Sequence, residues 1–398
     1  MALIHMLAAG TRFLPSVLIE PIKGDLGLGD AAIGLLQGPA FAIVNGAALI
    51  PMILLVRAWP ITRILVFAVL GSSMATLACG LAGSVETLIP ARMLLGLAQA
   101  AIAPAAMELI VVTMVPAHRG RGIGFFTAGA ALGRGLAMIG GGGLLALFAL
   151  SALPIAPWRL TFASAGLLGI PLALLVLRLG EPVGQREDRH GRLGEALKQM
   201  TTDRPVLLPL ILAAGCAVLA LQSLTSWSAS LLIRLHGLTP SQAGLYVGVV
   251  MMAAGAGGHA LGGTLADRLR REKRDAAPAL MLLGLALCAF ALWPLTQMTS
   301  LAAALMALAV AVAGLSIALV NALIGLQARI PSTLRIEGTA IFLTVVTLLG
   351  TALGPWAVGL ASQMIAGPTG LAAAIGWVLS ATCLIGCGAA WVARRRHG

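Results

Sequence analysis

The chain has 398 residues, of which 59% are hydrophobic and 10% are charged. A soluble protein carries roughly a quarter of its residues as Asp, Glu, Lys and Arg, so this composition excludes a soluble enzyme. It is also far too apolar for a disordered chain. The net charge of +12 indicates the basic cytoplasmic loops of a membrane protein rather than a nucleic-acid-binding surface. The expected partner is therefore a lipid bilayer, and no nucleic acid.

Long unbroken apolar runs follow one another along the chain. A bilayer-spanning helix needs about 20 apolar residues, and with its connection about 33, so the chain has room for about twelve spans. A β-barrel is excluded because its short strands would alternate polar and apolar residues. The runs predict an all-α polytopic membrane protein with spans at residues 2–22, 31–55, 64–82, 88–115, 123–148, 160–179, 206–232, 243–265, 278–297, 300–326, 338–360 and 371–393.

The longest polar stretch lies between the sixth and seventh predicted spans. It predicts a cytoplasmic linker at 180–205 between an N-terminal six-helix half (1–179) and a C-terminal six-helix half (206–398). Leu26-Gly-Leu and His236-Gly-Leu each precede a span at an offset of 210 residues. Two halves that repeat in parallel are typical of secondary transporters with a midplane site.

The basic residues predict the orientation. With both termini in the cytoplasm, three of the 26 Lys and Arg lie within spans, 20 lie in cytoplasmic segments, and three (Lys23, Arg159 and Arg234) lie on the opposite side. This bias agrees with the positive-inside rule. We therefore expect a monomeric multi-pass protein of the inner or plasma membrane with both termini inside.

The stretch Gly263-Thr-Leu-Ala-Asp-Arg-Leu-Arg-Arg271 lies between the eighth and ninth predicted spans. It resembles the cytoplasmic loop signature of the major facilitator superfamily, Gly-x-Leu-Ala-Asp-Arg-x-Gly-Arg-Arg. Arg92-Met-Leu-Leu-Gly96 resembles the family's Arg-x-x-x-Gly. The resemblance implies a transporter with a central cavity lined by the first, fourth, seventh and tenth spans. Glycine permits close helix approach and arginines stay at the lipid headgroups, so the expected gating residues are Gly263, Asp267, Arg268 and Arg271.

A closer resemblance is to the Spinster-like branch and its bacterial relatives, carried by Arg12 and the stretches 18–28, 33–41 and 234–245. That branch has Asp-Arg in the first span and Glu-Ala in the fourth. This chain has Thr11-Arg12 and Gln99-Ala100 instead. In relatives those acids are implicated in proton coupling, so their replacement argues against coupling by that route. Facilitated diffusion, exchange and coupling through another acid stay open.

Each charge at bilayer depth costs roughly 2.5–3.5 kcal/mol on insertion scales and therefore needs a reason. Arg12 lies near the middle of the first span, where it could anchor an anionic group or form a structural ion pair. Arg134 lies between Gly133 and Gly135 in the fifth span, and a gate or substrate role stands beside a structural pair. Arg92 lies close to the end of its span, which favours a structural role.

Two titratable residues are candidates for ion coupling. Glu108 lies inside the fourth span and could carry a proton or form a cytoplasmic-side ion pair. His259 lies in a glycine-rich part of the eighth span and could titrate near neutral pH, or be a packed histidine with its hydrogen bonds satisfied.

Neutral amides and a tryptophan complete the predicted site. They could line a polar cavity or bridge neighbouring helices. The three span arginines against one deep glutamate predict a positive cavity and a small anionic or amphipathic organic solute. No metal or other cofactor is expected, because the chain lacks a nucleotide-binding glycine loop, and Cys383 and Cys387, which share a helix face, have no His or acid nearby. The expected substrate-binding residues are Arg12, Gln99, Arg134, Gln222, Trp227 and Asn321.

Two rival classes of function remain. A membrane-embedded lipid-modifying enzyme would need a catalytic constellation, and the sequence offers none. A non-transporting sensor or scaffold descended from a transporter is supported by the first-half copy of the loop signature, where Arg57 takes the Asp position.

Overall fold

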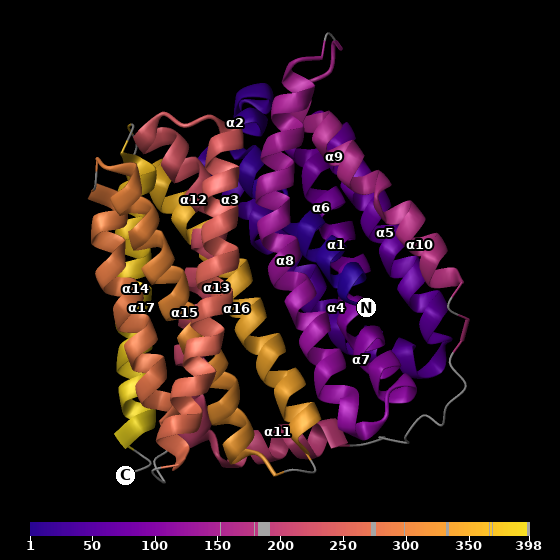
Figure 1. The fold of residues 1–398 in the computed structure, drawn as a ribbon, viewed down its shortest axis with the longest axis vertical. Helices are drawn as coiled ribbons and strands as arrows, with labels where there is room; N and C mark the ends of the chain where they lie inside the picture. The colour runs from indigo at the N-terminus through magenta and orange to yellow at the C-terminus, as the bar shows by residue number, and fades with distance from the viewer. Residues whose placement is uncertain are drawn as a thin grey trace. The chain divides into compact units, whose positions relative to one another are not determined.

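The computed structural model describes residues 1–151, 153–178, 180–181, 192–271, 276–297, 299–331, 334–365, 367 and 369–395. These residues form helices and connecting turns, without a strand (Figure 1). The helices are α1 (Ala2–Phe13), α2 (Pro15–Leu26), α3 (Asp30–Gln37), α4 (Pro39–Ala58), α5 (Ile61–Leu81), α6 (Val85–Ala100), α7 (Ile102–Thr113), α8 (Pro116–Ala149), α9 (Pro157–Leu167), α10 (Gly169–Leu177), α11 (Arg192–Thr202), α12 (Arg204–His236), α13 (Pro240–Arg271), α14 (Ala277–Gln297), α15 (Leu301–Arg329), α16 (Arg335–Ile365) and α17 (Gly370–Arg395).

Twelve stretches within the described residues are long and apolar enough to cross a membrane. Four of them join two consecutive helices: α1 with α2, α3 with α4, α6 with α7, and α9 with α10. The short helix α11 is not among them. Each of the twelve overlaps one predicted span, so the fold class expected from hydropathy is confirmed.

The first span is broken at Leu14, directly before Pro15. Proline has no backbone N–H to donate and its ring crowds the preceding turn, so the helical ladder is interrupted there. The second span is broken in the same way at Gly38, before Pro39. The last carbonyl groups of a helix lack intrahelical hydrogen-bond partners. Each break therefore leaves backbone carbonyls without such partners in the middle of a span.

The chain divides into two compact units. The first unit holds Met1–Glu187 and Ser226–Met252, and the second holds Asp188–Thr225 and Ala253–Gly398. Both α12 and α13 contribute to each unit. The two six-helix halves expected at 1–179 and 206–398, with their linker, stay a prediction.

Glycines bring α1 and α8 together in the first unit. A Cβ at Gly133 would lie 2.1 Å from the carbonyl oxygen of Met6, and one at Gly129 would lie 2.4 Å from that of Ala2. Beside them the ring of His5 stacks on Phe126 at 4.0 Å. Small residues allow this close approach of helices inside a membrane, where no hydrophobic effect drives helices together.

In the second unit, α14 packs against α15 and α17. Gly284 and Gly314 face each other there, and a Cβ on Gly284 would lie 2.2 Å from the carbonyl oxygen of Gly314. Cys288 and Cys383 are fully buried in this unit. All five cysteines of the chain are free thiols, and buried free cysteines behave as small apolar side chains.

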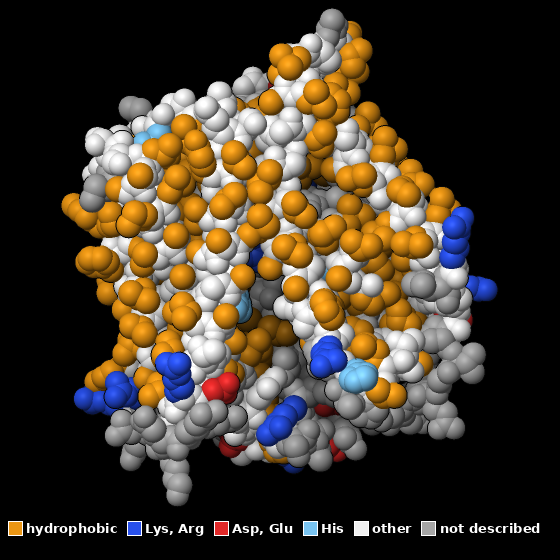
Figure 2. All heavy atoms as spheres, viewed as in Figure 1, with side chains coloured by type: hydrophobic (Ala, Val, Ile, Leu, Met, Phe, Trp, Pro, Cys, Tyr) orange, Lys and Arg blue, Asp and Glu red, His pale blue; other side chains and the backbone are white. Residues whose placement is uncertain are grey.

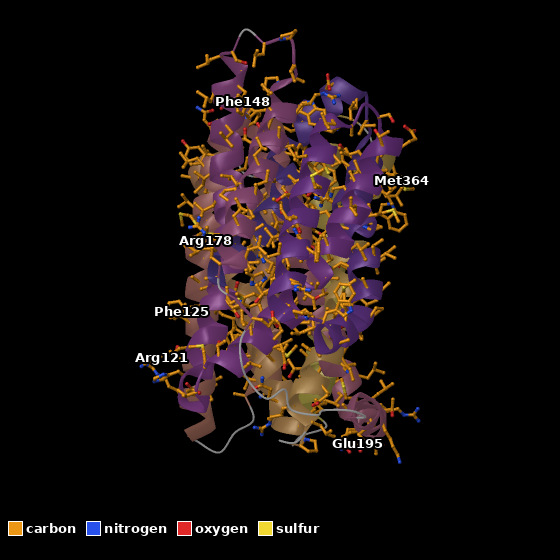
Figure 3. All side chains as sticks on the ribbon, turned by 90° about the vertical axis from the view of Figure 1, so that its right-hand side faces the viewer. Arg121, Phe125, Phe148, Arg178, Glu195 and Met364 are labelled. Carbon is orange, nitrogen blue, oxygen red and sulfur yellow. The ribbon has the colours of Figure 1, made fainter. Side chains whose placement is uncertain are left out.

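The surface of the helices is apolar along most of its length. Large side chains are exposed on it, including Phe67 at 64%, Trp293 at 73% and Trp377 at 78%. Figure 2 shows such side chains covering much of the visible face. On α8, Arg121 lies near one end of the helix and points outward, and Phe148 lies near the other end (Figure 3). A surface of this kind suits lipid tails rather than water.

Candidate functional site

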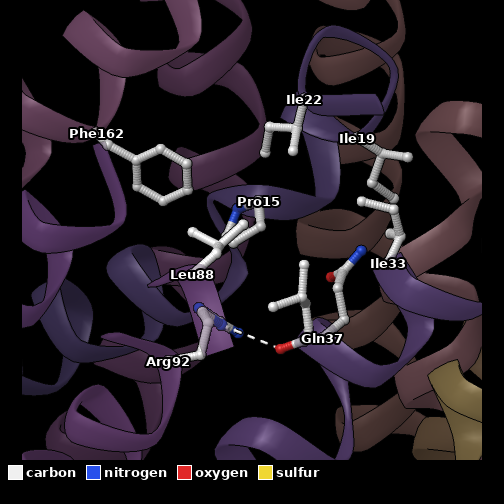
Figure 4. A pocket seen from close by; sticks show the side chains of 9 residues that line it. Pro15, Ile19, Ile22, Ile33, Gln37, Leu88, Arg92 and Phe162 are labelled. Atoms are coloured by element: carbon white, nitrogen blue, oxygen red, sulfur yellow. Dashed lines mark hydrogen bonds between the residues drawn. The ribbon is translucent and has the colours of Figure 1, made fainter. Parts of the chain in front are cut away.

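Arg92 of α6 reaches both of the proline breaks. Its Nη1 and Nη2 donate to the backbone carbonyl of Arg12 at 3.3 and 3.2 Å. Its Nε donates to the carbonyl of Leu36 at 3.2 Å, the bond drawn in Figure 4. These carbonyls belong to the last turns of α1 and α3, so Arg92 satisfies backbone groups that the breaks open. This geometry supports the structural role expected for Arg92.

Gly96, one turn after Arg92, lets α6 approach α4. A Cβ there would lie 2.5 Å from the carbonyl oxygen of Phe41. Asn45 closes the same contact, because its Nδ2 donates to the carbonyl of Gly96 at 2.9 Å. The Arg-x-x-x-Gly motif thus fixes the fourth span against the first and second spans.

Three arginines and two phenylalanines alternate in the first unit. The guanidinium carbons of Arg12 and Arg134 each lie 5.0 Å from the ring centroid of Phe13. On Phe41, the guanidinium carbon of Arg12 lies 4.5 Å and that of Arg92 5.7 Å from the centroid. Aromatic faces stabilise cations at such distances. The residues come from α1, α4, α6 and α8, four elements that the sequence keeps far apart. We call this group the arginine–phenylalanine cluster.

The cluster concentrates positive charge inside the first unit. The charges of Arg134 and Arg92 both act on Arg12, and those of Arg12 and Arg134 act on His5. Among the described residues, the buried Nε of Arg134 has no hydrogen-bond partner. A cation–π contact uses the flat face of a guanidinium and leaves N–H groups at its edge for an anion. The cluster therefore has the chemistry of an anion site.

Thr11 and Gln99 occupy the two positions where the Spinster-like branch has acids. Gln99 Nε2 donates to Thr11 Oγ1 at 3.0 Å and to the carbonyl of Ala8 at 2.9 Å. Thr11 in turn donates to the carbonyls of Leu7 and Ala8 at 3.1 Å. Both groups are uncharged, so this pair binds α1 to α6 without adding a negative charge beside Arg12.

A small cavity lies next to Arg92, which forms part of its wall (Figure 4). The rest of the lining is apolar except for Gln37. Ser16 Oγ donates to Gln37 Oε1 at 2.8 Å, while Gln37 Nε2 is buried without a partner among the described residues. Measured to the centres of water molecules the cavity is about 20 Å³, which is room for about one water. It is too small for an organic solute.

Of the other expected binding residues, two join neighbouring helices by hydrogen bonds and one is buried among them. In the second unit, Gln222 Nε2 donates to Thr351 Oγ1 at 3.1 Å, joining α12 to α16. Asn321 Nδ2 donates to the carbonyls of Gly262 and Ile317, which joins α15 to α13. Trp227 is fully buried in the first unit. Of the six expected binding residues, the structure brings Arg12 and Arg134 into the arginine–phenylalanine cluster, while Gln99 bonds Thr11 on α1.

The two candidates for ion coupling, Glu108 and His259, lie on α7 and α13. Glu108 is half-buried in α7 and makes no ion pair with any other described residue. His259 is exposed on α13, and its Nδ1 lies 2.8 Å from the carbonyl oxygen of Gly255. Within the described part of the chain, no three His, Cys, Asp or Glu side chains gather to hold a metal ion.

The expected gating loop is only partly described. Asp267 and Arg268 are exposed at the end of α13, and the side chain of Arg271 lies outside the described residues. No described atom lies within 4 Å of a Cβ built at Gly263, so the described residues show no close helix approach there, and its gating role stays a prediction. The approach occurs one residue earlier, since a Cβ on Gly262 would meet Val320 at 2.7 Å. The loop motif alone could not show which glycine faces α15.

A charged network in the first unit was not predicted from the sequence. Arg234 of α12 donates to both carboxylate oxygens of Asp30 at 2.7 and 2.8 Å and to Glu20 at 2.9 Å. Lys23 also pairs with Asp30. Arg234 was visible as one of three basic residues on the sparsely charged side, but its partners lie more than 200 positions away in the sequence.

Comparisons with known proteins agree with this architecture. Residues 1–355 match the family described as the Major Facilitator Superfamily. An "MFS-type efflux pump" of Mycolicibacterium smegmatis is 28% identical over 100% of this chain and 92% of its own length. A "Probable sulfoacetate transporter" of Cupriavidus necator is 26% identical over 72% of this chain and 68% of its own.

Solved structures share the fold. Two crystal structures of a bacterial homologue of the human lysosomal transporter Spinster, both inward-facing, one unoccupied and one occupied, have a TM-score of 0.87. They are 23% and 24% identical and cover 99% of this chain and 95% of theirs. At this identity the likeness concerns the fold.

Proposed function

Because the chain belongs to the Major Facilitator Superfamily, and is therefore a multi-pass membrane transporter of small solutes rather than an enzyme, we propose that its solute is a small organic anion. The observation that carries this proposal is the pair of guanidinium groups on the ring of Phe13, contributed by Arg12 and Arg134. Anions and planar N–H donors make strong charge-assisted hydrogen bonds. A relative described as a probable sulfoacetate transporter supports the same class of solute.

Transport in this proposal proceeds by alternating access in the inner membrane, with both termini in the cytoplasm. The halves 1–179 and 206–398 rock about the site, and Asp267, Arg268 and Arg271 contribute to the cytoplasmic gate. Gln222, Trp227 and Asn321 are the further residues that we propose to contribute to solute binding. The protein acts as a monomer.

Uptake into proteoliposomes tests the proposal. Labelled sulfoacetate, succinate and octanoate serve as probes, and Arg12→Gln is compared with Arg12→Lys. We expect Arg12→Gln to lower kcat/KM for the preferred anion by about 10²-fold, because a hydrogen bond to a charged group is worth about 1.5–3 kcal/mol. Arg12→Lys should retain part of the uptake, since it keeps the charge but loses the planar fork.

Arg63→Gln is the matched control, because Arg63 is an exposed arginine on α5 and the same charge is removed. Normal anion uptake by Arg12→Gln, with the protein present in the vesicles at the wild-type amount, would contradict the assignment of the site.

Proton coupling through Glu108 or His259 is the second candidate mechanism, supported by the partial burial of Glu108 within a membrane-spanning stretch. A pH-sensitive dye inside the vesicles tests it. Substrate-dependent proton movement that disappears in Glu108→Gln would assign coupling to Glu108, and the same loss in His259→Gln would assign it to His259. Anion flux without proton movement would exclude both roles.

A further inference from the structure

Within the arginine–phenylalanine cluster, no carboxylate of a described residue pairs with Arg92 or Arg134, so their positive charges are unbalanced. The ion pairs among the described residues join Lys23, Arg159 and Arg234 to acids near the ends of spans. Neither Arg92 nor Arg134 takes part in one. Arg92 donates to backbone carbonyls, and Arg134 lies on an aromatic face with its Nε unpartnered.

The neighbouring polar groups add no negative charge either. The Thr11–Gln99 pair, bonded at 3.0 Å between α1 and α6, is neutral at every physiological pH. An acid in either place could neutralise an arginine while the site is empty, or take up a proton when an anion enters. The uncharged pair can do neither.

A carrier that works by alternating access passes through a state in which its site is sealed from water on both sides. An unbalanced cation is costly in such a state, because burial removes the water that stabilises its charge. A bound anion supplies the missing charge. The loaded site therefore crosses this state more easily than the empty site, and the difference grows with the number of unbalanced arginines.

From these observations we propose that the chain is an anion exchanger, in which the site reorients rapidly with an anion bound and slowly when it is empty. This inference rests on the proposed anion-transport function, and it adds the mode of transport, which is exchange of one anion for another. One anion is carried across the membrane in one direction and a second anion is carried back in the other. No covalent bond is made or broken. The cost of sealing an uncompensated charge makes the empty step slower by about 100-fold.

Preloaded proteoliposomes test the exchange directly, with labelled sulfoacetate as the first probe and succinate and octanoate as the others. Uptake is measured into vesicles filled with the same unlabelled anion and into vesicles filled with buffer, with potassium and valinomycin holding the membrane potential at zero. We expect uptake into preloaded vesicles to be about 100-fold faster. Equal rates would overturn exchange while leaving anion transport standing.

The absence of movement for every probe under both conditions, with correctly folded protein in the vesicles, would instead overturn the proposed function and the exchange mode with it. The two failures are therefore distinguishable in one experiment.

A matched pair of variants tests the physical reason. Thr11→Asp places a carboxylate at the residue before Arg12, against Gln99 of α6, and Thr11→Asn places a neutral side chain of nearly the same size there. We expect net efflux from Thr11→Asp to rise by about 10-fold over wild type, because the empty site then carries less charge, while Thr11→Asn stays slow. Gln99→Glu is the second variant, since it approaches the same place from α6. Equally slow net efflux in both acidic variants, with exchange intact, would overturn the charge argument.

Discussion

A single missing methyl group at position 133 sets the distance between α1 and α8. The carbonyl oxygen of Met6 would lie 2.1 Å from a Cβ at Gly133, which is inside van der Waals contact. The backbone of α1 cannot give way like a flexible side chain. Arg134 is the next residue, so the contact at Gly133 also determines where its guanidinium meets Phe13.

Gly133→Ala should therefore destabilise the protein. We expect a loss of about 1–3 kcal/mol, the usual cost of overpacking, measured as a lower thermal unfolding midpoint in detergent. Gly140→Ala in the same helix is the control, because no described atom lies within 4 Å of a Cβ there and alanine favours helices over glycine. Equal midpoints for the two variants would contradict the close contact.

At the scale of elements, Arg234 ties α12 to α2 and α3. Asp30 is 7% exposed and Arg234 21%, so the pair is largely withdrawn from water, and its bidentate geometry is that of a strong charge-assisted bond. Lys23 and Glu20 extend it on α2. Removing one member of such a pair leaves the other charge buried without its partner.

A double-mutant cycle measures this connection. Asp30→Asn and Arg234→Gln should each lower the free energy of unfolding, and the double variant should lose less than the sum of the two. The expected coupling is about 0.5–3 kcal/mol, the range for residues within one ion-pair network. It should decrease only slightly in high salt, because buried pairs are screened less than exposed ones. Strictly additive losses would show that the two side chains act independently.

At the scale of the whole molecule, the orientation in the membrane follows from the bias of Lys and Arg toward one side. A pair of fusions tests it. Alkaline phosphatase fused after Leu153, between α8 and α9, should be active because that connection is expected outside the cytoplasm. Green fluorescent protein fused after Glu195 in α11 should fluoresce, because the linker is expected inside. The reverse pattern would overturn the predicted topology.

The sequence by itself determined the span number, the helical class and the family resemblance. Hydropathy is a local property, since about 20 consecutive apolar residues suffice to mark a span, and each of the twelve observed spans overlaps a predicted one. The breaks before Pro15 and Pro39 were not predictable in the same way, because Pro21, Pro51 and Pro355 lie inside continuous helices. Arg12 and Arg134 stood out because charge is rare at bilayer depth.

Only the tertiary structure decided which of these residues meet. Arg12 and Arg134 share Phe13, and Thr11 bonds Gln99. Gly262 rather than Gly263 faces α15. Each of these contacts depends on the rotation of a helix about its axis. Lipid and protein interior are similarly apolar, so the hydrophobic pattern of a membrane helix does not specify which face turns inward. Close packing at glycines and hydrogen bonds between helices make that choice, and both exist only once the helices have assembled.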